Sequence, residues 1–365
     1  MVPVGGLSSP PTAFDGVSRR VGKTSMGSLR TRRALGLALV ALLALVASAC
    51  GGGGDESGGQ APSSDVRVAL VTDIGGLNDR GFNALANTGL ERAESQLGIQ
   101  GRVFISDAAS DYVPNLTQGA RGGYDLVIGV GFLMGDALST VAKQFPDTKF
   151  AIVDFPWAAL KDKPANARGL VFAEQEAGYL VGVAAATAAG GGSVSAVGGQ
   201  AVPAVVAFLA GYQAGVKGTD PSMTVLQGYS QDFVDQAKCK ELALTQIARG
   251  SKAVFAAAGG CGLGALQAAK ERQVWGIGVD NDQSFLGPHI LKSATKKVDV
   301  AVFDTIESVT KDSFEGGGDT LYDVANGGVG YGKVSPDAPD RAALIEKLDD
   351  VSKQISSGDV DIPRR

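Results

Sequence analysis

The sequence predicts an α/β protein with two lobes, each built on a doubly wound sheet of mostly parallel strands. Its 365 residues exceed what one ordinary core needs and suit two domains of common size. Short apolar runs rich in β-branched residues alternate with helical apolar patterns along most of the chain. The 52 glycines suit the many tight turns that this alternation requires.

The composition narrows the function classes. With 44% apolar and 19% charged residues, the chain is typical of globular proteins rather than disordered ones. It has a single histidine, His289, which argues against histidine-based catalysis and against a multi-histidine metal site. We therefore expect no metal and no cofactor.

The first 49 residues have the pattern of an export signal. Ala34–Ala47 is an uninterrupted apolar run preceded by three arginines, and small residues lead from it to Cys50. This end of the run resembles a bacterial lipobox, in which Cys50 would be lipidated and become the mature first residue; the alternative is a plain signal peptide with a chance cysteine. Residues 1–25 are long for a leader, so translation starting at Met26 is a second expectation.

Residues 50–64 form a Gly/Ser-rich tether with an expected end-to-end distance on the order of 20 Å. This tether would hold the folded body at the extracytoplasmic face of the cell membrane, touching the membrane through the lipid alone. The leader holds six basic residues and one acidic residue, so its removal changes the net charge from −5 to −10. A body this acidic makes nucleic acid an unexpected partner.

The first strand–turn–helix unit anchors the predicted fold. Val66–Thr72 has the length and composition of a strand buried on both faces, and Asp73 and two glycines end it. Asn78 and Asp79 offer side chains that cap a helix with apolar positions from Phe82 to Leu97. Ligands of doubly wound domains bind outside the carboxyl ends of the strands, which here means residues 73–82.

The same alternation continues through both lobes. In the first lobe it predicts strands at 102–106, 125–131 and 149–154, helices near 112–118 and before 145, and a crossing segment at 169–172. Glu174–Ala189 is then a small-residue helix that we expect to pack tightly between the lobes; a membrane segment is the alternative, disfavoured by its shortness. Strands at 193–197, 223–229, 252–257 and 274–280, with helices between them, predict a second parallel sheet. A strand at 289–293 and helices at 300–311 and 341–357 end the chain.

Six segments together resemble the basic membrane protein family of bacterial substrate-binding lipoproteins, whose characterised members bind purine nucleosides for ABC importers. The similarity extends from about Arg67 to Tyr331. Its segments are VALVTDIGGLNDRGFN (68–83), GVGFLMGDAL (129–138), EAGYLVGVAAA (176–186), FAAAGGCGLGALQAAKE (255–271), GIGVDNDQS (276–284) and KKVDVAVFD (296–304).

The resemblance implies a type I periplasmic-binding fold, in which three crossings join two lobes that clamp the ligand. It places 65–172 with about 294–322 in lobe 1, and 173–293 with about 323–365 in lobe 2. It also implies a permease and an ATPase as partners, and we expect the body to act as a monomer.

Two phenylalanines match the residues that sandwich the base in the family, namely Phe82 and Phe233. An aromatic ring stacked on a base contributes about 1–3 kcal/mol. Both residues follow predicted strand-end turns, although packing in the core is the alternative for each.

Polar residues match the family's contacts to the sugar and to the base edge. Asp280 and Lys296 match the clamp on the sugar, where a carboxylate accepts and an ammonium donates hydrogen bonds. A surface ion pair is the alternative, and Lys297 competes with Lys296. Asp73 matches another carboxylate near the sugar, and Asp136 matches an acceptor at the base edge.

Further positions follow from the resemblance with less support. Asn78, Gly259 and Gly260 are added as ligand contacts, since a glycine backbone can approach a ligand closely. Cys239 and Cys261 depart from the family pattern. Both belong to one sheet edge of a βαβ unit, so in an exported protein they are expected to form a disulfide at the rim of the cleft, with two free buried thiols as the alternative.

The sequence therefore favours a binding protein over an enzyme. It contains no P-loop, so any ATP hydrolysis would occur in a partner. One alternative is a secreted nucleoside or glycoside hydrolase that uses Asp73, Asp136 and Asp280. Another is a sensor that presents its ligand-bound form to a membrane receptor.

Overall fold

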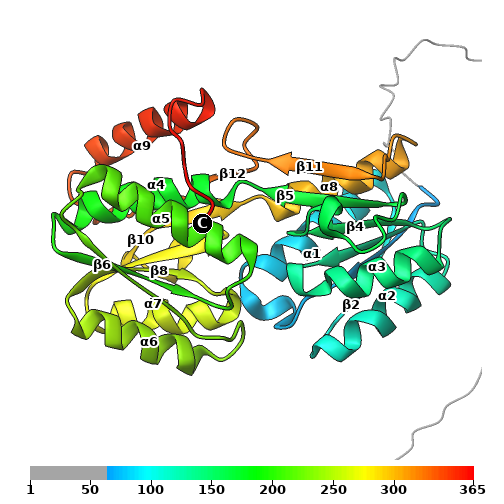
Figure 1. Cartoon of the computed structure of the whole chain (residues 1–365), viewed down its shortest axis with the longest axis horizontal. Coiled ribbons are helices and arrows are strands. Elements are labelled where there is room, and N and C mark those ends of the chain that lie inside the picture. Colours follow the sequence, from blue (N-terminus) through cyan, green and yellow to red (C-terminus); the bar gives the residue numbers. More distant parts are fainter. Residues whose placement is uncertain (1–63) are drawn as a thin grey trace, which may run out of the picture. The chain divides into compact units, whose positions relative to one another are not determined.

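The computed structural model describes residues 64–365, which form two six-stranded sheets with helices on both faces of each (Figure 1). The expected leader and Cys50, the expected lipidation site, lie outside the described residues. We call the part built on the first sheet lobe 1 and the part built on the second sheet lobe 2.

The sheet of lobe 1 is parallel throughout, in the order β11-β5-β4-β3-β1-β2. Its central strands are aliphatic and buried on both faces, as a parallel sheet between two helical layers requires. The strands are β1 (Arg67–Val71), β2 (Gln100–Phe104), β3 (Leu126–Val130), β4 (Lys149–Val153), β5 (Ala167–Phe172) and β11 (Gly318–Tyr322).

The sheet of lobe 2 has the order β12-β10-β9-β8-β6-β7, and only β12 is antiparallel to its neighbour. The strands are β6 (Ser193–Gly198), β7 (Thr224–Tyr229), β8 (Ser251–Ala257), β9 (Trp275–Asp280), β10 (Ile290–Lys296) and β12 (Val329–Tyr331).

The helices pack in pairs on the two sheets (Figure 1). In lobe 1, α1 packs with α8 and α2 with α3; in lobe 2, α4 packs with α5 and α6 with α7. The helices are α1 (Phe82–Leu97), α2 (Tyr112–Arg121), α3 (Gly135–Gln144), α4 (Glu174–Ala189), α5 (Pro203–Thr219), α6 (Gln236–Ala248), α7 (Gly262–Glu271), α8 (Val298–Thr310) and α9 (Arg341–Ser356).

The chain passes between the sheets three times, after β5, after β10 and after β11. The prediction that residues 169–172 form a crossing segment is wrong, because they belong to strand β5, which pairs with β4 on one side and β11 on the other. The return to lobe 1, predicted at about residue 294, comes later. Strand β10 continues to Lys296, which pairs with Val329 of β12.

Glycines bring α4 and α5 into close contact. A Cβ atom on Gly211 of α5 would overlap the backbone carbonyl of Gln175, and one on Gly178 of α4 would overlap that of Phe208. The tight packing predicted for α4 is therefore against α5, on one face of the lobe 2 sheet, rather than between the lobes. Helix α4 is buried against α5 and the lobe 2 sheet, so the membrane alternative for it is wrong. Among the described residues, no helix is long and apolar enough to cross a bilayer.

Candidate functional site

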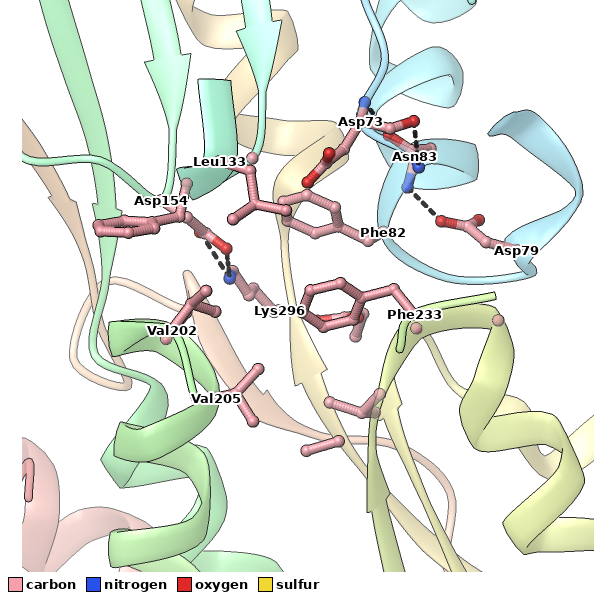
Figure 2. A pocket seen from close by; sticks show the side chains of 18 of the residues that line it. Asp73, Asp79, Phe82, Asn83, Leu133, Asp154, Val202, Val205, Phe233 and Lys296 are labelled. Carbon is pink, nitrogen blue, oxygen red and sulfur yellow. Dashed lines mark hydrogen bonds and ion pairs between the residues drawn. The ribbon is translucent and has the colours of Figure 1, made fainter. Parts of the chain in front are cut away.

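A cavity lies where the carboxyl ends of strands from both sheets meet (Figure 2). Its lining comes from the turns after β1, β3, β4 and β8, from the last residues of β9 and β10, from the starts of α1 and α5, and from the loop before α6. The carboxyl ends of the strands of both sheets therefore border the same cavity. Open α/β sheets bind their ligands at this end of the strands.

Phe82 is the first residue of α1, and its half-buried ring points into the cavity (Figure 2). Asp79 fixes the start of this helix. Its carboxylate accepts hydrogen bonds from the backbone N–H groups of Gly81, Asn83 and Ala84 at 3.0, 2.7 and 3.1 Å. These are donors that a helix N-terminus leaves unsatisfied, so Asp79 caps α1 and thereby orients Phe82.

Phe233 lines the same cavity from the loop between β7 and α6 (Figure 2). Its backbone carbonyl accepts a hydrogen bond from the N–H of Cys261 at 2.9 Å. Its ring lies so close to Gly199 that a Cβ atom there would overlap it. The two phenyl rings predicted to hold a planar ligand therefore line one shared cavity.

Lys296 carries the positive charge of the cavity. Its Nζ atom lies 2.6 Å from the carboxylate of Asp154 and 3.2 Å from that of Glu174, and all three side chains are buried. The ammonium also lies 5.1 Å from the ring centroid of Phe82 and 4.9 Å from that of Phe172. This buried cation is surrounded by carboxylates and aromatic faces, both of which favour its charged form.

The pKa values in this cluster follow from burial and from the single cation. Burial raises the pKa of Asp154 and of Glu174, and Lys296 opposes that rise in both. Burial alone would lower the pKa of Lys296, but the carboxyl groups of Asp154, Glu174 and Asp280 raise it above its ordinary value. The carboxyl groups thus favour the charged form of Lys296, while burial favours the neutral forms of the carboxyl groups themselves.

Asp280 has a buried carboxyl group with no hydrogen bond to any described residue, and it ends β9 in a left-handed backbone conformation with φ of 62°. Burial, together with the negative charges of Asp154 and Asp79, raises the pKa of Asp280 to about 7, against the opposing effect of Lys296. A buried polar group without a partner is costly, so this carboxyl group is available to a ligand.

Asp73 follows β1 and is held by several hydrogen bonds. It accepts one from the hydroxyl of Tyr112 and one from the N–H of Ile74 at 2.7 Å, and its own N–H donates to Asn83 at 2.9 Å. Burial raises the pKa of Asp73 to about 6, although the bonds from Tyr112 and Ile74 lower it. The sequence did not single out Tyr112, which begins α2 beyond the neighbouring strand β2.

Seven of the nine predicted ligand contacts line the cavity. They are Asp73, Phe82, Phe233, Gly259, Gly260, Asp280 and Lys296.

The other two predictions, Asn78 and Asp136, are not part of the cavity lining, and both side chains are exposed. Asn78 lies in the short 3₁₀ helix Gly76–Asp79, where its neighbour Asp79 turns inward to cap α1. Asp136 lies in the first turn of α3, and the preceding Phe132 and Leu133 line the cavity in its place.

The sequence analysis also missed Asp154 and Glu174. Asp154 directly follows β4, and Glu174 lies two residues beyond β5. The rule that identified Asp73, a polar residue just after a buried strand, applies to Asp154 equally. Both residues are partners of Lys296, which lies 142 positions after Asp154 and 122 positions after Glu174 in the sequence. No local sequence pattern shows contacts over such separations.

Cys239 and Cys261 form a disulfide in the structure, with Cα atoms 5.6 Å apart. Cys261 ends the short 3₁₀ helix Gly259–Cys261, whose two glycines line the cavity. Among residues 64–365, no group of three or more histidine, cysteine or acidic side chains is arranged to hold a metal ion.

Comparison with known proteins shows the family. The family model described as ABC transporter substrate-binding protein PnrA-like, named Bmp, matches residues 66–365. The chain belongs to the Bmp family. It is therefore a substrate-binding protein of the ABC transporter class, which confirms the family predicted from the six segments.

Two relatives and one solved structure support this assignment. A Lactococcus lactis protein named ABC transporter nucleoside-binding protein BmpA is 34% identical over 82% of this chain and 91% of its own length. A Pyrococcus abyssi protein named as an uncharacterized lipoprotein is 35% identical over 82% of this chain and 77% of its own length. The crystal structure of an ABC transporter solute-binding protein from Aeropyrum pernix has a TM-score of 0.74 and 25% identity, covering 82% of this chain and 94% of that one. The predicted two-lobe α/β fold is confirmed.

Proposed function

We propose that this Bmp-family protein captures a purine nucleoside, or a similar planar ligand that bears a sugar, between its lobes without chemically changing it. The observation that carries the proposal is the composition of one cavity. Two phenyl rings, from Phe82 and Phe233, line it together with the buried Asp280 and Lys296. A flat apolar end and a charged hydrogen-bonding end suit the two halves of a nucleoside.

The aromatic end would hold the base. A nucleobase has two π faces, and a phenyl ring can stack on each of them, at about 1–3 kcal/mol per stacked ring. Leu133, Val202 and Val205 add apolar surface to the cavity (Figure 2). A simple hexose offers no comparable flat surface, so we expect it to bind weakly.

The polar end would hold the sugar. The carboxylate of Asp280 can accept hydrogen bonds from two neighbouring hydroxyl groups. The ammonium of Lys296 has three N–H donors, and Asp154 and Glu174 occupy two of them. The third N–H of Lys296 is then available to a sugar hydroxyl.

The cellular setting follows from the family and from the leader. Substrate-binding proteins of ABC transporters deliver ligands to a permease driven by an ATPase, and we propose these as the partners. Lipidation of Cys50 would keep the protein, as a monomer, at the extracytoplasmic face of the membrane. The names of the Lactococcus and Pyrococcus relatives support the nucleoside ligand and the lipid anchor, respectively.

Titration calorimetry on the purified protein tests the proposal. Inosine, guanosine and adenosine are titrated in parallel with ribose and with free hypoxanthine, and we expect one site per chain with the nucleosides binding most tightly. Failure of all three nucleosides to bind would contradict the proposal. The same mixtures are then analysed for free base, since its release would instead support the hydrolase alternative.

A further inference from the structure

The loop that carries Phe233 has little regular structure of its own. It extends from Ser230 to Asp235 between β7 and α6, and Val234, next to Phe233, is 48% exposed. A loop of this kind explores several conformations unless neighbouring groups restrain it. The position of the Phe233 ring therefore depends on what holds the loop.

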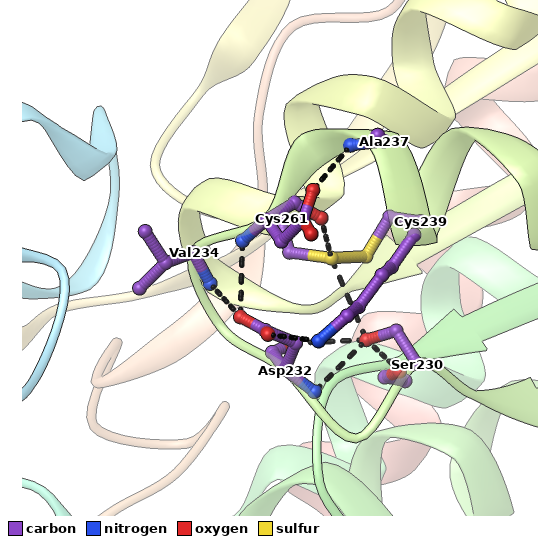
Figure 3. Close-up of polar contacts among 9 residues, drawn as sticks. Ser230, Asp232, Val234, Ala237, Cys239 and Cys261 are labelled. Atoms are coloured by element: carbon purple, nitrogen blue, oxygen red, sulfur yellow. Dashed lines mark hydrogen bonds and ion pairs between the residues drawn. A yellow bond between two sulfur atoms is a disulfide. The ribbon is translucent and has the colours of Figure 1, made fainter.

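Asp232 restrains the loop from within (Figure 3). Its carboxylate accepts hydrogen bonds from the N–H groups of Val234 at 2.8 Å and Asp235 at 3.0 Å. Because these bonds span Phe233, they hold it within a tight turn. The same carboxylate pairs with Lys238 at 2.7 Å. Asp235 then caps α6 by accepting a hydrogen bond from the N–H of Ala237 at 2.9 Å.

The disulfide restrains the loop from outside (Figure 3). Cys239 lies in the first turns of α6, and Cys261 lies beside the loop at the end of the turn after β8. The N–H of Cys261 donates to the carbonyl of Phe233 at 2.9 Å, and the Cys261 sulfur lies 2.9 Å from the carbonyl oxygen of Asp235. The loop leads into α6, and the disulfide fixes α6 to Cys261. Cys261 is also the residue that holds the Phe233 backbone.

We propose that Asp232 and the Cys239–Cys261 disulfide are positioning residues that hold the Phe233 ring in the cavity before a ligand arrives. This inference rests on the proposed function, since Phe233 is assigned there as a base contact. Ordering a loop during binding costs affinity, and ordering it beforehand removes that cost. The disulfide and Asp232 then affect the affinity for flat ligands through the position of Phe233, and they do not contact the ligand themselves.

A double-mutant cycle on inosine affinity separates positioning from general stability. Replacing both cysteines with alanine should weaken inosine binding about tenfold when Phe233 is present, because the ring is no longer held in place. In the Phe233→Ala background, the same cysteine replacement should weaken binding by less than about twofold, since the positioned ring is already gone. Equal losses in the two backgrounds would overturn the positioning role.

Variants of Asp232 provide a graded test of the same role. Asp232→Ala should weaken inosine binding, and Asp232→Asn should restore most of the affinity, because an amide oxygen accepts the same two N–H bonds. Asp220→Ala is the matched control, since Asp220 makes a similar local bond to the N–H of Ser222, at 2.9 Å, outside the cavity lining. If Asp232→Asn weakened inosine binding as much as Asp232→Ala does, the proposed role of the turn would be overturned.

Hydrogen exchange on the ligand-free protein tests the inference independently of any ligand. A phosphine reductant gives the disulfide two electrons and is oxidised to the phosphine oxide, while water supplies its oxygen and the two protons that leave two thiols. We expect faster amide exchange in peptides covering 230–237, with unchanged exchange in peptides covering β1 and β3. Unchanged exchange at 230–237 would contradict the inference, whereas failure of the oxidised wild-type protein to bind any nucleoside would contradict the proposed function alone.

Discussion

Asp280 ends β9 with its carboxyl group buried, without a hydrogen bond to any described residue, and with a backbone conformation that few L-residues adopt. Asp154 has a similar left-handed φ of 67°, but it pairs with Lys296. Aspartate tolerates this backbone region better than most residues, which explains its presence at both strand ends. The difference between the two is that Asp154 is already paired with Lys296, whereas Asp280 has no hydrogen-bond partner among the described residues.

Replacing Phe82 or Phe233 with alanine should weaken nucleoside binding at least about tenfold, because each ring contributes about 1.4 kcal/mol or more of stacking. Calorimetry with inosine measures the change. Phe285→Ala is the control, since Phe285 is 57% exposed and is not part of the cavity lining. Unchanged affinity in both cavity variants would mean that the base binds elsewhere.

Asp280→Asn should stabilise the ligand-free protein at neutral and higher pH while abolishing tight binding. The folded-state pKa of Asp280, about 7, is above the ordinary value of 3.8, so its contribution to stability is fully present below about pH 3.8 and is lost as the pH rises through about 7. Asparagine cannot ionise and tolerates the same backbone conformation. We expect the melting temperature to rise by about 2 °C or more at pH 8, and the gain to shrink toward pH 4.

Asp312→Asn is the matched control for this prediction. Asp312 also has a left-handed backbone, with φ of 56°, but it is exposed. Its replacement should leave the melting temperature unchanged at both pH values. A gain in Asp280→Asn that persisted equally at pH 4 would show that ionisation is not its cause.

At the scale of secondary-structure elements, the contact between α4 and α5 depends on glycines that allow backbone to approach backbone. Gly211 meets the carbonyl of Gln175, and Gly215, one helical turn further on, meets that of Tyr179. Because a carbonyl group in a helix cannot move aside easily, an added methyl group would force the two helices apart. Helix α5 also supplies Val205 and Phe208 to the cavity, so this packing positions part of the site.

Gly211→Ala should therefore lower the free energy of unfolding by about 1–3 kcal/mol, although alanine favours a helix more than glycine does. Gly218→Ala, near the end of the same helix, is the control. Its added methyl group would meet only the hydroxyl end of Tyr179, which can move, so we expect no loss. Denaturation with urea compares the two variants, and an equal effect in both would argue against the packing explanation.

The sequence predicts the alternating elements well because strands buried on both faces and long helices have strong local patterns. It does not predict β11 or β12. Strand β11 is an edge strand with alternating burial, and β12 has three residues, so neither resembles a buried strand.

Asp73, predicted from its place at a strand end, and Asp280, given by the family resemblance, both line the cavity, but Asp136, also given by the resemblance, does not. That side chain's direction depends on the register of α3, which residue spacing alone does not determine.

At the scale of the whole described body, Lys296 joins segments from both lobes. It is the last residue of β10, just before the second crossing, while Asp154 follows a strand of lobe 1 and Glu174 begins α4 after the first crossing. One ammonium therefore links the first two crossings to the end of β4 in lobe 1. The same group lines the cavity, so a ligand bound there as proposed would meet the ammonium that links the crossings.

Lys296→Met should lower the free energy of unfolding by about 3–5 kcal/mol at pH 7, because it leaves two buried acids without their cation. The loss should be smaller at pH 5, where Asp154 and Glu174, whose pKa values burial raises, protonate more readily. Lys143→Met is the control, since its pair with Asp162 is exposed and its removal should not change the melting temperature measurably. A loss at pH 5 as large as at pH 7 would contradict this explanation.

A crystal structure of the protein with inosine tests the central claim most directly. The account predicts electron density for the base between the rings of Phe82 and Phe233, with the ribose hydroxyls within hydrogen-bonding distance of Asp280 and Lys296. Inosine bound outside this cavity, or bound within it with the base away from both rings, would contradict the account.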